Sequence, residues 1–331
     1  DKDYYNSGET YSPATISIKK SGVMRGIQLA RITISPFEYN PTTNKLTINN
    51  NLKVKINFRN ADLALSENLK NKYYSPDFSS IYNKIWNYSS SSAKDSLTSY
   101  PVKYVIVSDP AFQSALQPFI EWKTQKGFNV IEAYTDNPSV GTTKASIKSY
   151  LQNLYTNASP SDPAPSYVLF VGDIAQIPSY DGNEGNHVTD MYYCEYDGGG
   201  DYIPDVYFGR FSATNQAELT PQINKTLQLE KYTMPDDAFL AEAVMVAGVD
   251  GTYGNSHANG QINYGTQEYF NTAHGIQSNT YLYPNSGNNA SSILADIAAG
   301  AGFVNYTAHC SSSGWADPSF SSSDILNLNN Q

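Results

Sequence analysis

The chain has 331 residues, which is enough for roughly two or three domains. With 40% hydrophobic residues and no apolar run of membrane-spanning length, its composition is typical of a soluble globular protein. Two cysteines cannot form a disulfide framework, and no signal peptide is visible. The formal net charge is −10, and the basic residues form no stripe that would hold nucleic acid. The sequence thus predicts no transmembrane segment and no nucleic-acid partner.

Charge is divided unevenly along the chain. Residues 1–97 carry 13 Lys and Arg against 8 Asp and Glu, whereas residues 98–331 carry 8 against 23. A basic N-terminal part beside an acidic remainder suggests that one docks electrostatically on the other. Separate solvation of the two parts explains the same charges, and from charge alone it is the preferred interpretation.

The N-terminal part is predicted to be a small antiparallel β domain. Residues 15–58 alternate between apolar and polar side chains, which is typical of strands with one buried face. Residues 46–48 and 52–58 flank Asn49-Asn50-Asn51, which predicts a hairpin there. The serine-rich stretch 88–99 predicts a polar linker and a site of proteolytic cleavage, so the first domain is expected to span 1–97.

From residue 101 onward the pattern changes to alternating strands and helices. The predicted strands are 102–107, 128–134, 167–171, 206–211, 243–249, 279–283 and 302–308, and the predicted helices are 111–126, 142–156, 216–231, 261–273 and 290–299. Such alternation is typical of βαβ units with parallel sheets. We expect two α/β subdomains, 98–237 and 238–331, the second of which has few strands and is expected to be truncated.

His309 is the first candidate for chemistry, because it follows the apolar strand 302–308 directly. Open α/β sheets place their sites at the carboxyl ends of strands. Of the four histidines, His274 stands in the same Thr-Ala-His sequence. However, Gly275 follows as a helix C-cap, so His274 is interpreted as structural. For His309, position alone leaves structural and catalytic roles equally open.

Two more residues could act with His309. Asp250 follows the first strand of the same subdomain, where a carboxylate can orient an imidazole, although an aspartate there also commonly caps the following loop. Cys310 is adjacent to His309, and neighbouring strand residues point to opposite faces. Its thiol is therefore badly placed for proton transfer, but its backbone N–H could bind a developing oxyanion. Cys194 is expected to be structural, and no serine lies in a Gly-x-Ser-x-Gly context.

A second candidate is the acidic, glycine-rich segment 197–205, which contains Asp197, Asp201 and Asp205. Asp201, Ile203 and Asp205 alternate, so two carboxylates and the Ile203 carbonyl could face one point. Oxygen cages of this kind suit Ca²⁺. An ordinary Asp/Gly turn accounts for the segment equally well.

Several motifs resemble one known family. They are Phe37–Leu46, Trp122–Phe128, Val140–Lys148, Val171-Gly172-Asp173, Phe208–Ser212 and, most specifically, Asn305–His309 followed by Gly314–Pro318. In these motifs, which span most of the chain, the sequence resembles the gingipains, secreted cysteine endopeptidases with a caspase-like fold. The Lys-specific members are the most similar in overall sequence pattern.

The resemblance implies roles for individual residues. His309 would be the catalytic histidine, Asp250 its carboxylate partner, and the nucleophilic cysteine would follow residue 331. Cys310 stands where the family usually has Gly, and Gln261 where Arg-specific members carry an acidic residue, so Lys is favoured over strict Arg specificity. The implied Ca²⁺ ligands are Asp173, Asp197, Asp201, Ile203 and Asp205, in a loop with the extra glycines Gly199 and Gly200.

These inferences favour a secreted or cell-surface cysteine endopeptidase zymogen acting on protein or peptide substrates. The expected fold is two caspase-like parallel-sheet subdomains, the second truncated, after a β-rich prodomain that acts as an intramolecular inhibitor. Lys84 and Lys94 flank the linker and could be sites of self-release. This chain alone is expected to be inactive, and the remaining catalytic portion could come from a second chain. The alternatives are a catalytically incomplete fragment or pseudo-enzyme that binds a partner, and a carbohydrate- or peptide-binding module.

Overall fold

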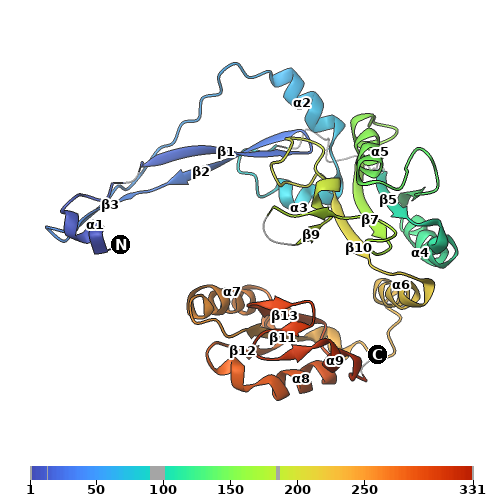
Figure 1. Cartoon of the computed structure of the whole chain (residues 1–331). Helices are drawn as coiled ribbons and strands as arrows, with labels where there is room; N and C mark the ends of the chain where they lie inside the picture. Colours follow the sequence, from blue (N-terminus) through green and yellow to red (C-terminus); the bar gives the residue numbers. More distant parts are fainter. Residues whose placement is uncertain (1, 13, 90–100, 184–186, 330–331) are drawn as a thin grey trace. The chain divides into compact units, whose positions relative to one another are not determined.

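The computed structural model describes residues 2–12, 14–89, 101–183 and 187–329. The chain divides into two compact units, Asp1–Leu227 and Gln228–Gln331, and the division falls within helix α6, Gln216–Lys231. The predicted prodomain and first α/β subdomain thus share one unit, while the second subdomain forms most of the other (Figure 1). The domain boundary expected between residues 97 and 98 lies outside the described residues.

Two antiparallel hairpins lie in the N-terminal part of the first unit (Figure 1). Strand β1, Ile16–Met24, pairs with β2, Ile27–Ile34, and strand β3, Phe37–Asn40, pairs with β4, Lys45–Ile48. The accompanying helices are α1, Lys2–Ser7, α2, Leu63–Lys72, and α3, Ser79–Tyr82. The prediction of small antiparallel strands ahead of the α/β region is therefore confirmed.

The hairpin predicted around Asn49-Asn50-Asn51 is wrong. Strand β4 instead turns back on β3 through residues 41–44, where Asn44 adopts a positive φ of 48°. Residues 52–58 form no strand, although Val54 and Ile56 are half-buried and line a groove beside β1 and β2. The alternation in this stretch thus reflects one-sided burial of side chains rather than hydrogen-bonded pairing.

Four parallel strands form the sheet of the first α/β subdomain, in the order β10-β7-β5-β6. They are β5, Val102–Ser108, β6, Phe128–Tyr134, β7, Pro165–Val171, and β10, Tyr207–Phe211. The two central strands, β5 and β7, are buried along most of their length, as their apolar sequences require when helices cover both faces. The predicted strand 128–134 has the observed bounds of β6.

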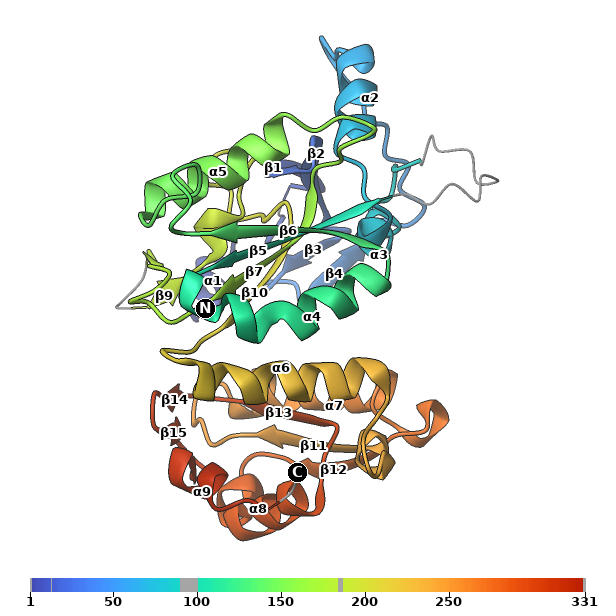
Figure 2. The same cartoon turned by 90° about the vertical axis from the view of Figure 1, so that its right-hand side faces the viewer.

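Helices cover both faces of this sheet (Figure 2). Helix α5, Lys144–Thr156, starts at a capping box formed by Thr143 and Ser146 and buries Ile147 and Leu151 on one face. Helices α4, Gln113–Gln125, and α6 bury their apolar side chains on the other face. The short strands β8, Tyr180–Asp181, and β9, Val188–Thr189, pair within the loop between β7 and β10.

The second unit is built on three parallel strands in the order β12-β11-β13. They are β11, Glu242–Ala247, β12, Gln277–Tyr281, and β13, Phe303–Thr307. Helix α7, Asn259–Glu268, packs through Ile262 on one face, and helix α8, Ala290–Ala299, packs through Ile293 and Ile297 on the other. The buried side chains of both helices pack against the central strand, β11.

A small antiparallel sheet follows β13. Its strands are β14, Cys310–Ser311, β15, Gly314–Trp315, and β16, Phe320–Ser321, in the order β14-β15-β16. Ser321 and Asp324 form a capping box at the start of α9, Ser322–Leu326. The chain therefore reverses twice soon after His309, which follows β13.

One predicted helix ends earlier than expected. The pattern predicted a helix over 261–273, whereas α7 ends at Glu268 and a separate 3₁₀ turn covers Thr272–His274. The side chain of Asn271 accepts a hydrogen bond from Ala273 N and so begins that turn. An asparagine that binds nearby backbone competes with helix continuation in this way.

The core of the first sheet generates a stability prediction. Phe170 is 0% exposed on β7, whereas Phe208 is 40% exposed on the neighbouring β10. We expect Phe170→Ala to destabilise the protein by about 3–5 kcal/mol, because it removes a buried ring and leaves a cavity. Phe208→Ala is the matched control and should cost far less. Denaturant unfolding followed by circular dichroism measures both, and equal losses would contradict this description of the core.

Candidate active site

Two neighbouring parallel strands of the second unit bring their carboxyl ends together. Strand β11 pairs with β13 in a register that sets Ala247 opposite Thr307. Beyond these residues, Gly248 N donates to the Thr307 carbonyl at 3.1 Å, which extends the contact past the strand ends. The chain then delivers Asp250 from one strand and His309 from the other.

The structure brings His309 and Asp250 within hydrogen-bonding distance. His309 Nε2 lies 3.2 Å from Asp250 Oδ2. The histidine side chain is 84% exposed, whereas that of the aspartate is 15% exposed. Because Nε2 faces the carboxylate, Nδ1 is the ring nitrogen left to exchange a proton with a substrate or nucleophile. The exposed ring can be reached by both.

Asp250 also caps the loop that follows it, so both sequence interpretations of this residue describe real contacts. Its Oδ1 accepts from Tyr253 N and Thr252 N, each at 2.8 Å. The backbone N–H groups of Tyr253 and Thr252, followed by His309, hold the pKa of Asp250 below its ordinary value. The carboxylate is therefore ionised at neutral pH and fixed in the orientation that faces the imidazole.

The main chain of His309 is held by residues that sequence reasoning missed. The Tyr306 hydroxyl donates to the His309 carbonyl at 2.9 Å, and Ala316 N donates to the same oxygen at 3.0 Å. Tyr306 stacks on Trp315 with ring centroids 4.3 Å apart, and burial raises the pKa of its hydroxyl. The sequence signal for this role was a tyrosine near the end of a mostly apolar strand, because a buried tyrosine hydroxyl usually finds a hydrogen-bond partner. These contacts fix the backbone position from which the imidazole side chain extends.

Gly248 has to be a glycine at this strand end. A Cβ added there would lie 2.5 Å from Ala308 Cβ, 2.6 Å from the Tyr306 ring and 2.8 Å from the Asp317 carbonyl oxygen. Real side chains do not approach that closely, so any larger residue would push the two strand ends apart. The close approach of Asp250 and His309 thus depends on the missing side chain.

Cys310 and Gln261, the other predicted residues of this site, form no hydrogen bond or ion pair with His309 or Asp250 in the described part of the chain. Cys310 begins β14 directly after His309, and its side chain is exposed. Gln261 lies in the first turn of α7 with an exposed side chain, and a π-helical turn, Gly254–Ala258, joins it to the Asp250 loop. Cys194 belongs to the other unit, where burial raises the pKa of its thiol well above the ordinary value.

His274 is not part of this site. It ends a 3₁₀ turn whose C-cap, Gly275, has a φ of +74°. Its Nδ1 lies 3.1 Å from Asn271 Oδ1 within the same turn. The cap predicted at Gly275 is therefore confirmed, and the structural role of His274 stays a prediction.

The five predicted calcium ligands do not gather at one point in this structure. Asp173 lies after β7, where its Oδ1 accepts from Ile174 N at 2.8 Å. Throughout the described part of the chain, no three Asp, Glu, His or Cys side chains form a group that could hold a metal ion. As arranged here, the residues do not fit a calcium ion.

The carboxylates of the acidic segment instead accept hydrogen bonds from backbone amides. Asp205 Oδ2 accepts from Tyr196 N at 2.6 Å and from Asp197 N at 2.9 Å. Asp205 is fully buried, and desolvation raises its pKa to about 6 despite these donors. Because this pKa is raised, its contribution to stability is complete below its unfolded pKa and is lost as pH rises through about 6.

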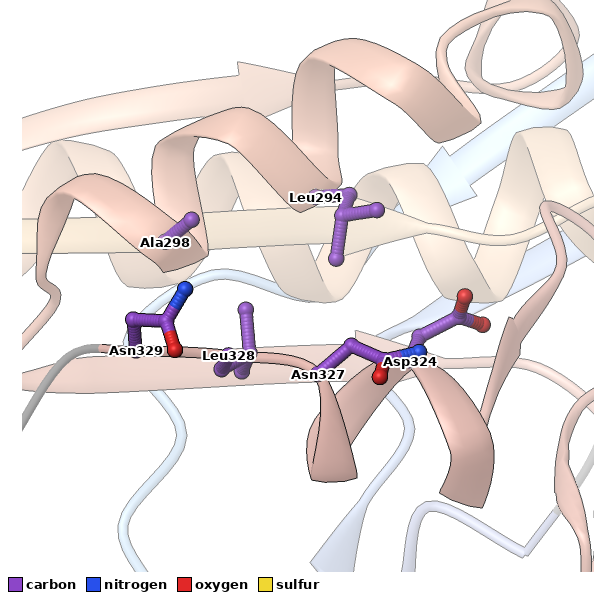
Figure 3. A pocket seen from close by; sticks show the side chains of 6 residues that line it. All are labelled: Leu294, Ala298, Asp324, Asn327, Leu328 and Asn329. Carbon is purple, nitrogen blue, oxygen red and sulfur yellow. The ribbon is translucent and has the colours of Figure 1, made fainter.

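A hollow of about 520 Å³ lies elsewhere in the second unit, between α8 and the residues around α9 (Figure 3). Leu294 and Ala298 face Asp324, Asn327, Leu328 and Asn329 across it. It contains none of the predicted site residues, so it carries no part of the proposed chemistry.

Comparison with known families gives matches at two levels. Residues 97–331 match the profile of Peptidase family C25, and residues 1–78 match its propeptide, Propeptide_C25. The chain therefore belongs to Peptidase family C25 and carries the family's propeptide ahead of its peptidase region. The resemblance to gingipains is confirmed.

Individual relatives support the same assignment. Lys-gingipain of Porphyromonas gingivalis is 36% identical over 95% of this chain, and gingipain R2 of the same organism is 22% identical over 98%. The chain spans only 18% of the length of that Lys-gingipain and 44% of that of gingipain R2.

Solved structures agree on the fold. One described as a protease matches with a TM-score of 0.63 and 38% identity, covering 70% of this chain and 50% of the other. The crystal structure of the Arg-specific cysteine proteinase gingipain R matches with a TM-score of 0.58 over 70% of this chain and 52% of the other. A complex of gingipain pro- and mature domains matches at 0.58, covering 69% of this chain and 52% of the other. The predicted caspase-like α/β fold is thus confirmed, and no helix among the described residues is long and apolar enough to cross a membrane.

Proposed function

We propose that the protein is the zymogen of a cysteine endopeptidase that acts on proteins or peptides outside the cell or at its surface. The observation that carries this proposal is the 3.2 Å approach of His309 Nε2 to Asp250 Oδ2 at adjacent strand ends. Membership of Peptidase family C25 supports the class of reaction. The secreted location rests on the resemblance to gingipains alone.

In the proposed reaction, a cysteine that follows residue 331 supplies the nucleophile. His309 takes the thiol proton through Nδ1, and the thiolate attacks the carbonyl carbon of the scissile peptide bond. The imidazolium then gives that proton to the departing amine, and water hydrolyses the remaining thioester to a carboxylic acid and the free thiol. Asp250 holds the ring and stabilises its cation, while the backbone N–H of Cys310 is proposed to bind the oxyanion.

The propeptide is proposed to keep the enzyme inactive until it is removed. The propeptide match over residues 1–78 and the many contacts of this region with the first α/β subdomain support that role. Lys84 is exposed and so is a candidate cleavage site, whereas Lys94 lies outside the described residues. A second chain that completes the catalytic portion remains a proposal as well.

Replacement of the two Thr-Ala-His histidines tests the catalytic assignment. In protein that includes the segment after residue 331, His309→Ala should lower kcat/KM for a lysyl peptide on the order of 10²–10⁴-fold, since it removes the general base. His274→Ala is the matched control and should leave activity within about twofold. Equal activity of both variants would overturn the role of His309, and absence of activity in the unaltered protein would favour a pseudo-enzyme.

Gln261 is proposed to help select the residue before the cleaved bond. Gln261→Glu should increase cleavage after Arg relative to Lys by roughly tenfold or more, because a carboxylate can bind a guanidinium with two hydrogen bonds. Gln267→Glu, an exposed position on the same helix, is the control for added charge. Assays on paired Arg and Lys peptides measure the ratio, and an unchanged ratio in the Gln261 variant would remove it from the specificity site.

Calcium at Asp173, Asp197, Asp201, Ile203 and Asp205 stays a prediction of the resemblance. If the ion binds there, chelation should lower the thermal midpoint of the full chain, and Asp201→Asn should weaken that response. Differential scanning fluorimetry with chelator and with added CaCl₂ measures both. A midpoint that responds to neither treatment would exclude a stabilising calcium site.

A further inference from the structure

The turn of the first hairpin places an arginine at the position where an asparagine would be expected. Between β1 and β2, the two central residues Arg25 and Gly26 have φ values of +48° and +75°. Positive φ at both positions is the mark of a type I′ turn, for which Asn-Gly is the usual choice. An arginine is uncommon in this conformation and persists only when its surroundings hold it there.

The side chain of Arg25 is completely buried, and its acceptors come from both the propeptide and the first α/β subdomain. Nε donates to the Tyr73 carbonyl at 2.6 Å. Nη1 donates to the Pro165 carbonyl at 2.8 Å and to the Asp205 carbonyl at 2.6 Å. The guanidinium also lies over two aromatic rings, 4.8 Å from the centroid of Phe78 and 5.9 Å from that of Tyr155.

The backbone of the same turn is bound by three carboxylates. Val23 N donates to Asp201 Oδ2 at 2.6 Å, Arg25 N donates to Asp205 Oδ1 at 2.7 Å, and Gly26 N donates to Asp197 Oδ2 at 2.6 Å. The Tyr155 hydroxyl donates to the last of these carboxylates at 2.7 Å. Each acid of the glycine-rich segment therefore binds one amide of the propeptide turn.

We propose that the first α/β subdomain contains a guanidinium-binding socket, made of Tyr155, Pro165, Asp197, Asp201 and Asp205, whose ligand is Arg25 of the propeptide. The socket recognises a β-turn that presents an arginine, and it keeps the propeptide bound after the chain has been cut in the linker. The regulatory meaning of this contact rests on the proposed zymogen function, whereas the binding itself does not.

This socket differs from attraction between a basic and an acidic domain. Exposed charges are screened by salt over roughly 8–10 Å, but fully buried hydrogen bonds are not screened in that way. Lysine would keep the charge of Arg25, yet its single ammonium lacks the planar fork that serves three carbonyls in different directions. The socket therefore requires arginine and is insensitive to salt.

Propeptide release from a nicked chain tests the proposal. A cleavage site for a specific protease is placed within residues 90–100 of the full chain, in a His309→Ala background that excludes self-cleavage. After cutting, gel filtration and a fluorescent label on the propeptide give its dissociation rate. The readout needs no peptidase activity, so its failure is separate from any failure of the proposed function.

The expected rates follow from the lost contacts. The nicked parent should stay associated at both about 50 mM and about 500 mM NaCl. The Debye length is longer than roughly 8–10 Å at the lower concentration and shorter at the higher one. Arg25→Ala should release the propeptide on the order of 100-fold faster, and Arg25→Lys about tenfold faster. Arg31→Ala, which removes an exposed arginine from β2 of the same hairpin, is the matched control and should match the parent.

Three results would overturn the socket. They are release from Arg25→Ala at the parent's rate, equal acceleration by Arg31→Ala, and release that follows salt in the parent. If Arg25→Ala fails to fold, Gly22→Ala gives a second test, because a Cβ on Gly22 would lie 2.4 Å from Asp201 Oδ2. That variant keeps the arginine but displaces the turn, so it should release faster than the parent, and an unchanged rate would count equally against the proposal.

Discussion

The parallel pairing of β11 with β13 is the constraint on which the proposed chemistry depends. It sets Ala247 opposite Thr307, so the two chains leave the sheet at the same level, and Gly248 lets them stay close. Asp250 and His309, which follow these two strand ends, are therefore brought close together. Neither residue needs an unusual conformation, because the sheet itself supplies the juxtaposition. The hydrogen bonds of Tyr306 and Ala316 to the His309 carbonyl hold the backbone of this exposed histidine in place.

Much of this arrangement could be predicted from the sequence. The parallel strands are apolar runs of the right length, and helix 290–299 was predicted with its observed bounds. The pairing of Asp250 with His309 follows from their shared place after such strands. Local signals failed where long-range contacts decide the outcome. Residues 52–58 alternate like a strand because Val54 and Ile56 are half-buried, but no neighbouring strand binds their backbone.

The acidic segment shows most clearly why the rest could not be predicted. A carboxylate needs an electropositive partner, and a sequence of Asp and Gly does not say whether that partner is a metal ion or an amide. For Asp201 and Asp205, amides of the propeptide turn supply it, from Val23 and Arg25 nearly 200 residues earlier; the separations are 178 and 180 residues. Nothing local marks Arg25 either, since an arginine in a hairpin turn normally points to solvent. Only the folded chain reveals that this one is buried.

We propose that His309 activates a cysteine that follows residue 331. Alkylation of the full-length protein by iodoacetamide, with the modified peptides mapped by mass spectrometry, tests it most directly. We expect one cysteine after residue 331 to react fastest, its modification to abolish peptidase activity, and its reactivity to fall in His309→Ala, because the histidine promotes the thiolate. Loss of activity that instead tracks modification of Cys310, or equal reactivity with and without His309, would contradict this role of His309.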